Sequence, residues 1–406
     1  MTARRAGALV LTAMLAVATP LASSPAVAGS NDWVRVGDDR VLHLTGHGYG
    51  HGHGMSQYGA EGAARAGRSY KHILSFYYPG TNRDRVENGI RVLITADTDD
   101  DVVVQPARGL FVRDTKDEKK FDLPRTSEIN RWRLSPLAQD PSATKVQFLR
   151  SGSWHRYRLP GRTDFRGTGE FRADGALSLV LPGGSTRVYR DTLRAARPSA
   201  GSASRATVNV LPLQKYVKGV VAAEMPPSWH QAALRAQSVA ARTYAMNQRR
   251  SNLKRYYQVC DTTSCQVYAG KSGETPSTNT AVTATYGVIL RYNGSPAFTQ
   301  FSSSSGGWTA KGSAPYLPVK RDRYDNWSGN YVHTWHTRIS ASSVQSRYPQ
   351  IGTLQKVRTR ARDGHGDWGG RVGSVRLVGS RSAVTVSGET MRFGFGLRST
   401  WFKFNR

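Results

Sequence analysis

A nine-residue run, GHGYGHGHG (residues 46–54), places a glycine at every second position of the chain. The intervening positions carry His47, Tyr49, His51 and His53. In an extended strand, alternate residues face opposite sides, so five glycines would line one face and the four rings the other. Glycines weaken a strand, so the run predicts a segment whose backbone another group approaches closely. A flexible Gly/His tract that binds metal, as in a secreted metalloenzyme, is the alternative interpretation.

The N-terminus has the features of an export signal. Arg4 and Arg5 precede the apolar run GALVLTAMLAVA, and AVA at residues 26–28 supplies small residues for cleavage. This pattern predicts a signal peptide over residues 1–28, and its apolar stretch is too short to span a bilayer comfortably. We therefore expect a secreted, cell-wall-associated protein with no stable membrane span.

The charge of the chain is strongly basic, with 57 Lys and Arg against 28 Asp and Glu, a formal net charge of +29. Such a charge favours retention by polyanions. No aromatic-rich RNA motif or zinc finger accompanies it, which argues against a nucleic-acid partner. For an exported protein, the expected partners are anionic wall polymers.

The order of the patterns predicts an α+β fold with more strand than helix. Short strands with turn residues between them fill most of residues 88–212, and strands return after residue 280. Residues 213–250 form the strongly helical block, and a helix of small residues is expected from about Ala60 to Phe76. We divide the mature chain, residues 29–406, into a Gly/His segment (41–81), a strand-rich portion or subdomain (88–200) and a core (205–404).

The helical block carries one acidic residue on an apolar stripe. Valines at 217, 220 and 221 form that stripe, Glu224 falls on it, and the following MPP ends the helix. Burial raises the pKa of a carboxyl group, as a general acid near neutral pH requires. Alternatively, Glu224 faces solvent at the helix end or caps a neighbouring helix. Ser228 and Gln231 form a capping-box pattern for the next helix, whose small-residue face includes Tyr244.

Two further stretches bear on the site. Cys260 and Cys265 lie five residues apart, and in an oxidising compartment a local disulfide is favoured over a metal site, which would need additional ligands. The polar stretch FSSSSGGWT (residues 301–309) follows an apolar strand, so it suits a loop that lines a groove, although a flexible linker has the same composition.

Taken together, these stretches resemble the stage II sporulation protein D family, also called SpoIID/LytB domains. The resemblance covers residues 41–81 and 205–404. The motifs that carry it are GHGYGHGHGMSQYGA, SYKHILSFYYPGT, LPLQKYVKGVVAAEMPPSWHQAALRAQSVAARTYA, CDTTSCQVYAG, FSSSSGGWT and VSGETMRFGFGLRSTWF.

The resemblance implies a lytic transglycosylase that cleaves MurNAc–GlcNAc bonds of peptidoglycan glycan strands, preferring strands without stem peptides, and leaves 1,6-anhydroMurNAc ends. It places the catalytic glutamate on Glu224, within VVAAEMP. No cofactor is required. The family also implies an alternative, a noncatalytic wall-binding enhancer of an N-acetylmuramoyl-L-alanine amidase, which would make that amidase a partner. The expected substrate-binding residues are His51, Ser56, Gln57, Tyr244, Ser304, Gly306 and Gly307.

Two departures from the family pattern matter. Family members commonly carry the Gly/His motif after the LRSTWF-like strand, whereas here it opens the mature chain. Such a circularly permuted order requires the two ends of the domain to lie close together. Metal-binding members have a histidine just before the second cysteine, where this chain has Ser264, so zinc is not expected and the disulfide is favoured further.

Overall fold

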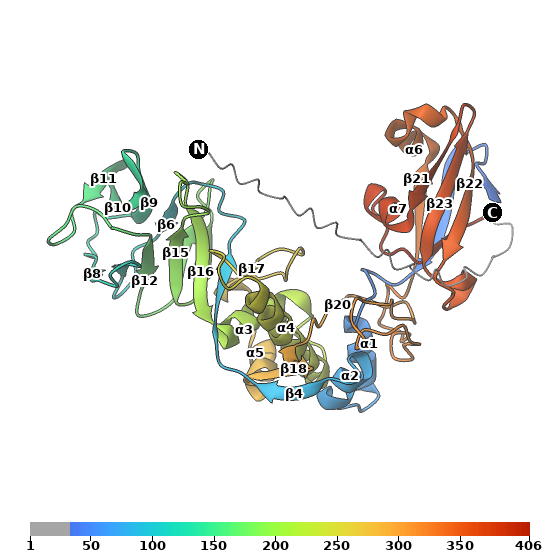
Figure 1. Cartoon of the computed structure of the whole chain (residues 1–406), viewed down its shortest axis with the longest axis horizontal. Coiled ribbons are helices and arrows are strands. Elements are labelled where there is room, and N and C mark those ends of the chain that lie inside the picture. The colour runs from blue at the N-terminus through green and yellow to red at the C-terminus, as the bar shows by residue number, and fades with distance from the viewer. Residues whose placement is uncertain (1–32) are drawn as a thin grey trace, which may run out of the picture.

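The computed structural model describes residues 33–406, so the predicted signal peptide lies outside the described residues. The fold is α+β, as the sequence predicts, with β-sheets at both ends and helices between them (Figure 1). Within residues 33–406, no helix combines the length and the apolar character needed to cross a membrane.

The strand-rich portion contributes to two large sheets, the second of which also includes strands beyond residue 200. The first has the order β11-β10-β9-β6-β13-β14. Its strands are β6 (Val102–Val104), β9 (Arg131–Leu137), β10 (Asp140–Arg150), β11 (Ser153–Tyr157), β13 (Leu177–Val180) and β14 (Thr186–Tyr189). The second has the order β17-β5-β16-β15-β12-β7-β8, and only β17 pairs in parallel within it. Its strands are β5 (Gly89–Leu93), β7 (Phe111–Asp114), β8 (Lys120–Asp122), β12 (Gly169–Arg172), β15 (Thr192–Ala196), β16 (Ala206–Pro212) and β17 (Val259–Cys260).

The helical middle shares one hydrophobic core with these sheets. Its helices are α1 (Gln57–Arg65), α2 (Tyr70–Tyr77), α3 (Leu213–Glu224), α4 (Gln231–Ser251) and α5 (Pro276–Ala284), with a short 3-10 helix at Lys271–Gly273. A three-stranded sheet of order β19-β18-β4 packs beside α4, formed by β4 (Asn82–Arg85), β18 (Val288–Tyr292) and β19 (Ser295–Pro296). Buried alanines of α4 leave room for α1, α3 and α5 to pack closely against it.

A second hydrophobic core joins both ends of the described chain. The strands around it are β1 (Trp33–Arg35), β2 (Val41–His47), β21 (Thr334–Ser340), β22 (Leu354–Arg362), β23 (Val372–Gly379), β24 (Ala383–Ser387) and β25 (Phe402–Phe404). They form sheets of order β1-β22-β23-β24 and β21-β2-β25, with α6 (Ala341–Arg347), α7 (Gly388–Gly394) and 3-10 turns at Pro349–Ile351 and Asp367–Gly369. Because β2 pairs directly with β25, the early Gly/His segment lies beside the final strand, as a permuted order requires.

The Gly/His run departs from the predicted strand after His47, where β2 ends. Gly48 and Gly52 have φ angles of +74° and +78°, values that L side chains rarely adopt. A Cβ on Gly48 would lie 2.7 Å from the Ser304 carbonyl oxygen, and one on Gly52 would overlap the Arg371 guanidinium. The groups that approach this backbone at Gly48 and Gly52 are therefore other parts of the protein. The run turns into the two-stranded parallel sheet of β3 (Met55–Ser56) and β20 (Phe301–Ser302).

Candidate active site

Glu224 is the last residue of α3, and two distant segments hold it there. The valines of the predicted stripe are fully buried, whereas Glu224 is half-buried at the point where the chain turns into an extended Met225. Its Oε1 accepts a hydrogen bond of 2.9 Å from the Val267 backbone N–H. Gln57 Nε2, at the start of α1, donates to the Glu224 carbonyl oxygen over 3.1 Å. The helix end is thus fixed from both sides.

The electrostatic environment of Glu224 favours a proton. Burial raises the pKa of this carboxyl group above its ordinary value of 4.5, and the hydrogen bonds from Val267 and Gln57 oppose that rise. Burial disfavours the carboxylate, while the N–H of Val267 stabilises it once it forms. A group balanced in this way can give up a proton and later accept one.

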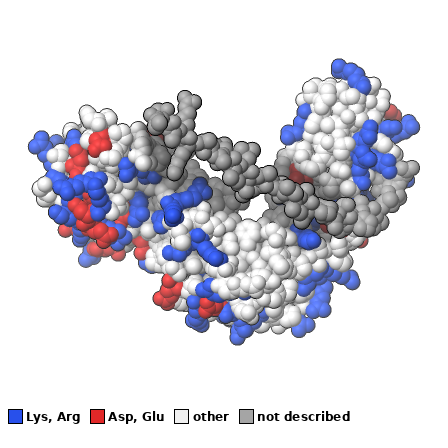
Figure 2. Space-filling view, viewed as in Figure 1, with Lys and Arg blue, Asp and Glu red and all other residues white. Residues whose placement is uncertain are grey.

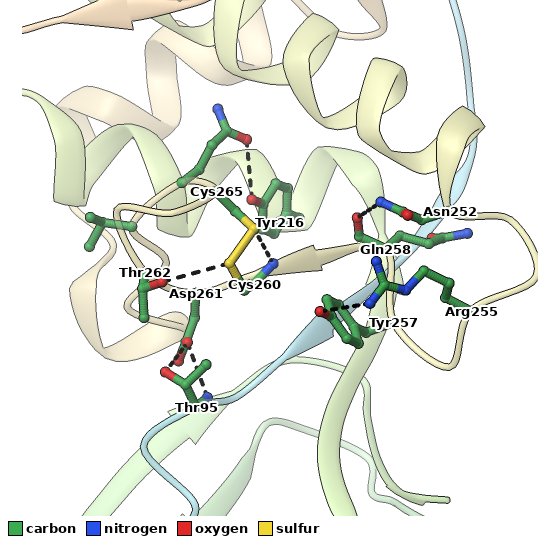
Figure 3. The surroundings of a disulfide bond; sticks show 12 residues. Thr95, Tyr216, Asn252, Arg255, Tyr257, Gln258, Cys260, Asp261, Thr262 and Cys265 are labelled. Atoms are coloured by element: carbon green, nitrogen blue, oxygen red, sulfur yellow. Dashed lines mark hydrogen bonds between the residues drawn. A yellow bond between two sulfur atoms is a disulfide. The ribbon is translucent and has the colours of Figure 1, made fainter. Parts of the chain in front are cut away.

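A disulfide restrains the loop that supplies the Val267 N–H. Cys260 and Cys265 are bonded, and the Cys260 N–H donates to the sulfur of Cys265 (Figure 3). The next residue, Gln266, accepts a hydrogen bond from the Tyr216 hydroxyl of α3 over 3.2 Å. The bond between the cysteines therefore lies one residue from the contacts that hold the loop against α3. In residues 33–406, no three His, Cys, Asp or Glu side chains are grouped so as to hold a metal ion.

Three aromatic rings lie beside the ring of Tyr58, the residue after Gln57, and the four are here called the aromatic patch: Tyr58, Trp229, Trp327 and Tyr331. The Tyr58 ring lies 4.9 Å from that of Trp229 and 5.7 Å from that of Tyr331, centroid to centroid. Trp327 donates from Nε1 to the Tyr58 carbonyl oxygen. Tyr331 is 74% exposed and the other three are partly exposed. The patch was not predicted, although the sequence places Tyr58 beside Gln57 and Trp229 five residues after Glu224.

His51 and His53 of the Gly/His run are partly buried and contact each other. The rings of His51 and His53 lie 4.8 Å apart, and the His53 N–H donates to His51 Nδ1. Burial, followed by the charges of His53 and two arginines, lowers the pKa of His51 to about 3. His51 is therefore neutral near neutral pH and available for hydrogen bonding without charge. Within the described chain, no hydrogen bond or ion pair joins it to Glu224.

The polar stretch FSSSSGGWT (residues 301–309), here called the serine loop, is organised by a buried carboxylate that was not predicted. Asp325 accepts from the Ser56 hydroxyl (2.6 Å), the Ser304 hydroxyl (2.8 Å) and the Gly306 N–H (3.0 Å). Ser56 also caps α1 by accepting from the Gly59 N–H. Both serine side chains are buried, so they hold the loop against α1, which differs from the direct substrate contact expected of them.

Asp322 lies beside Asp325 and differs from it in charge state. Asp322 accepts from the hydroxyls of Tyr77 and Ser305, each over 2.9 Å. Burial and the negative charge of Asp325 raise the pKa of Asp322 to about 7. Hydrogen bonds, first among them that of His333, hold the pKa of Asp325 below its usual value despite burial. The pair thus carries one negative charge, on Asp325, more readily than two.

The remaining predicted residues occupy varied positions. Gln57 is buried and contacts Glu224 as described, and Gly307 lies beside the His333 ring with a φ of +102°. Tyr244 is half-buried and stacks on Phe298 at 5.4 Å. Burial raises the pKa of the Tyr216 hydroxyl, and the charges of Glu224 and Tyr244 raise it further.

Comparisons with known proteins agree with these motifs. Residues 202–292, which contain α3, α4 and the disulfide, match the family model described as Stage II sporulation protein, SpoIID. The chain is similar to an amidase enhancer of Bacillus subtilis, with 44% identity over 137 residues, covering 32% of this chain and 18% of the relative. It is also similar to stage II sporulation protein D of Bacillus subtilis, with 30% identity over 221 residues, covering 49% and 62%. The corresponding protein of Bacillus amyloliquefaciens is 31% identical over 226 residues, covering 50% and 63%. The chain thus spans less than two thirds of the length of these relatives.

Proposed function

Because this chain belongs to the SpoIID family, whose members point to a role at the cell wall, we propose that it is a peptidoglycan lytic transglycosylase with Glu224 as its acid and base. The observation that carries the proposal is the environment of Glu224. This side chain is half-buried, has a raised pKa, and is held at Oε1 by the Val267 N–H. No cofactor enters the reaction.

In the first step, protonated Glu224 donates its proton to the oxygen between MurNAc and GlcNAc. The bond from that oxygen to C1 of MurNAc breaks, and positive charge develops on the ring as an oxocarbenium-like state. The departing GlcNAc keeps the oxygen as a hydroxyl group. Glu224 is left as a carboxylate, which the Val267 N–H stabilises.

In the second step, the same carboxylate accepts the proton of the C6 hydroxyl of that MurNAc. The C6 oxygen attacks C1 and closes the 1,6-anhydro ring, and Glu224 regains its proton. No water is consumed, and no second carboxylate is needed as a nucleophile. One carboxyl group that changes role is sufficient.

The aromatic patch supports a sugar substrate. Aromatic rings offer broad apolar faces together with polar edges, which suits the apolar faces of sugar rings. Tyr58 follows Gln57, whose side chain holds the end of α3, and the Trp229 ring contacts the Tyr58 ring, so a strand stacked on the patch would approach the end of α3 that carries Glu224. Secretion and retention by anionic wall polymers remain part of the same proposal.

The test is a digest of purified, denuded glycan strands analysed by mass spectrometry. The wild-type protein should yield anhydro ends, one water lighter than hydrolytic ends, and Glu224→Gln should yield none while keeping its fold. Glu128→Gln, which removes an exposed carboxylate beside Arg150, is the matched control and should cleave at the wild-type rate.

The similarity to an amidase enhancer favours one second candidate, a noncatalytic wall-binding module that assists an N-acetylmuramoyl-L-alanine amidase. Under this alternative, the digest without amidase gives no product. Adding the protein to an amidase would then accelerate release of stem peptides, and Glu224→Gln would accelerate it equally.

A further inference from the structure

A groove lined by five cations lies on the seven-stranded sheet, away from the aromatic patch. It has a volume of about 530 Å³. Its cationic residues, here called the basic groove, are Arg91, Arg194, Arg197, Lys254 and Arg255. Its lining residues, all within the described part of the chain, include no Asp or Glu. Figure 2 shows Lys and Arg side chains gathered in the middle of the drawn face, where β16 and β17 lie in Figure 1.

The sheet register places two of these arginines on one face. Arg91 of β5 pairs with Val210 of β16, and Arg194 of β15 pairs with Val208. Since Val208 and Val210 are two residues apart on one strand, the side chains of Arg91 and Arg194 point to the same side of the sheet. The sheet therefore holds the two guanidinium groups in a fixed spatial relation.

Protein carboxylates balance the charges in and beside the groove only in part. Glu170 of β12 is fully buried and is shared by Arg113, Arg172 and Arg194. The Arg91 guanidinium donates through Nη2 to the backbone oxygens of Leu253 and Arg255. Burial, followed by the positive charges of Arg194 and Arg249, lowers the pKa of Arg91. An anion bound in the groove would relieve this repulsion.

The loop at the rim of the groove leads directly to the proposed catalytic site. Lys254 and Arg255 precede β17, which ends at Cys260 of the disulfide (Figure 3). Two hydrogen bonds join Arg91 and Gln258: the Gln258 N–H donates to the Arg91 backbone oxygen, and the Arg91 N–H donates to the side-chain Oε1 of Gln258. A polymer in the groove would thus be fixed to the same loop that holds Glu224 through Val267.

We propose that the basic groove binds an anionic, phosphodiester-linked polymer of the cell wall and so retains the protein beside its glycan substrate. Four of its five cations are arginines, whose planar guanidinium groups match phosphate oxygens in pairs. The choice of a wall polymer as the anion rests on the proposed cell-wall function. The binding itself does not require that Glu224 be catalytic.

The test measures the affinity of the full mature protein for purified poly(glycerol phosphate) teichoic acid over a range of salt concentrations. The groove variant combines Arg197→Gln, Lys254→Gln and Arg255→Gln. The matched control removes the same charge from three exposed arginines in or next to β22 and β23: Arg360→Gln, Arg376→Gln and Arg381→Gln. We expect the groove variant to lose about tenfold or more in affinity and part of its salt dependence, and the control less than about threefold. Unfolding curves of both variants should match the wild type.

Three outcomes would overturn the proposal: equal losses in the two variants, no loss in either, or groove-dependent binding of a DNA oligonucleotide that is tighter than binding of the teichoic acid. Running the same titration on Glu224→Gln separates this proposal from the enzymatic one. That variant should bind the polymer like the wild type whether or not glycan strands are cleaved.

Discussion

Substituting the buried carboxylate Asp325 by asparagine tests whether it organises the site. Its Oδ1 accepts from the Ser56 hydroxyl and the Ser305 N–H. Its Oδ2 accepts from the Ser304 hydroxyl, the Gly306 N–H, His333 Nδ1 and Asn330 Nδ2. An asparagine keeps the shape of the side chain, but its NH₂ group must face the donors of one of these two sets.

At least two hydrogen bonds to a charged acceptor are then lost. Each such bond contributes about 1.5–3 kcal/mol, so Asp325→Asn should lower the free energy of unfolding by about 3–6 kcal/mol. This is a large part of the stability of an ordinary domain, about 5–15 kcal/mol. The site should suffer too, because Ser56 directly precedes the Gln57 that holds the end of α3.

Asp322→Asn is the matched control, since it makes the same isosteric change three residues away. Because its pKa is raised to about 7, Asp322 favours its protonated, uncharged form below that pH. A neutral amide therefore replaces the Asp322 side chain more closely than it replaces the charged Asp325. We expect a loss of about 1 kcal/mol, the value of one neutral hydrogen bond. Urea unfolding of the two variants, followed by tryptophan fluorescence, makes the comparison. Equal losses would refute the assignment of Asp325 as the organising group.

Further predictions concern the carboxyl group, the disulfide and one glycine. Because the pKa of Glu224 is raised, the carboxyl group keeps its proton above pH 4.5. As the pH increases, kcat/KM should therefore fall with an apparent pKa above 4.5. A fall centred below pH 4.5 would contradict this. Replacing both Cys260 and Cys265 by serine should lower the free energy of unfolding, measured in urea, by about 2 kcal/mol. It should also lower kcat more than it raises KM. An unchanged kcat would show that the disulfide does not support the site. Gly48→Ala should destabilise the fold by about 1–3 kcal/mol or more, because of its positive φ and its close approach to Ser304. Gly67→Ala, at a similar φ but in open space, should destabilise the fold less. A lower melting temperature for Gly67→Ala than for Gly48→Ala would contradict the packing described.

The sequence predicted best those features that local periodicity determines. The valine stripe and the MPP that follows it placed the end of α3 at Glu224, as observed. The extended strand predicted for the Gly/His run is observed for Gly46 and His47, the last residues of β2. The expected helix from about Ala60 to Phe76 is instead two helices, α1 and α2, which Ser56 and Ser69 cap separately.

The features that were wrong or missed depend on distant segments. The capping box at Ser228 does not form, because α4 begins after His230, whose N–H donates to Glu61 of α1. Likewise, the glycine run adopts positive φ angles because the serine loop and Arg371 pack against it. The Asp325 network joins residues more than two hundred positions apart, so no local pattern could have indicated it.

The central claim is that Glu224 both donates and accepts the proton of a reaction that consumes no water. The most direct measurement is the digestion of denuded glycan strands in water labelled with heavy oxygen, followed by mass analysis of the new MurNAc ends. The wild type should give anhydro ends without label, and Glu224→Gln should give no new ends. Labelled ends, or unlabelled anhydro ends formed at the wild-type rate by Glu224→Gln, would contradict it.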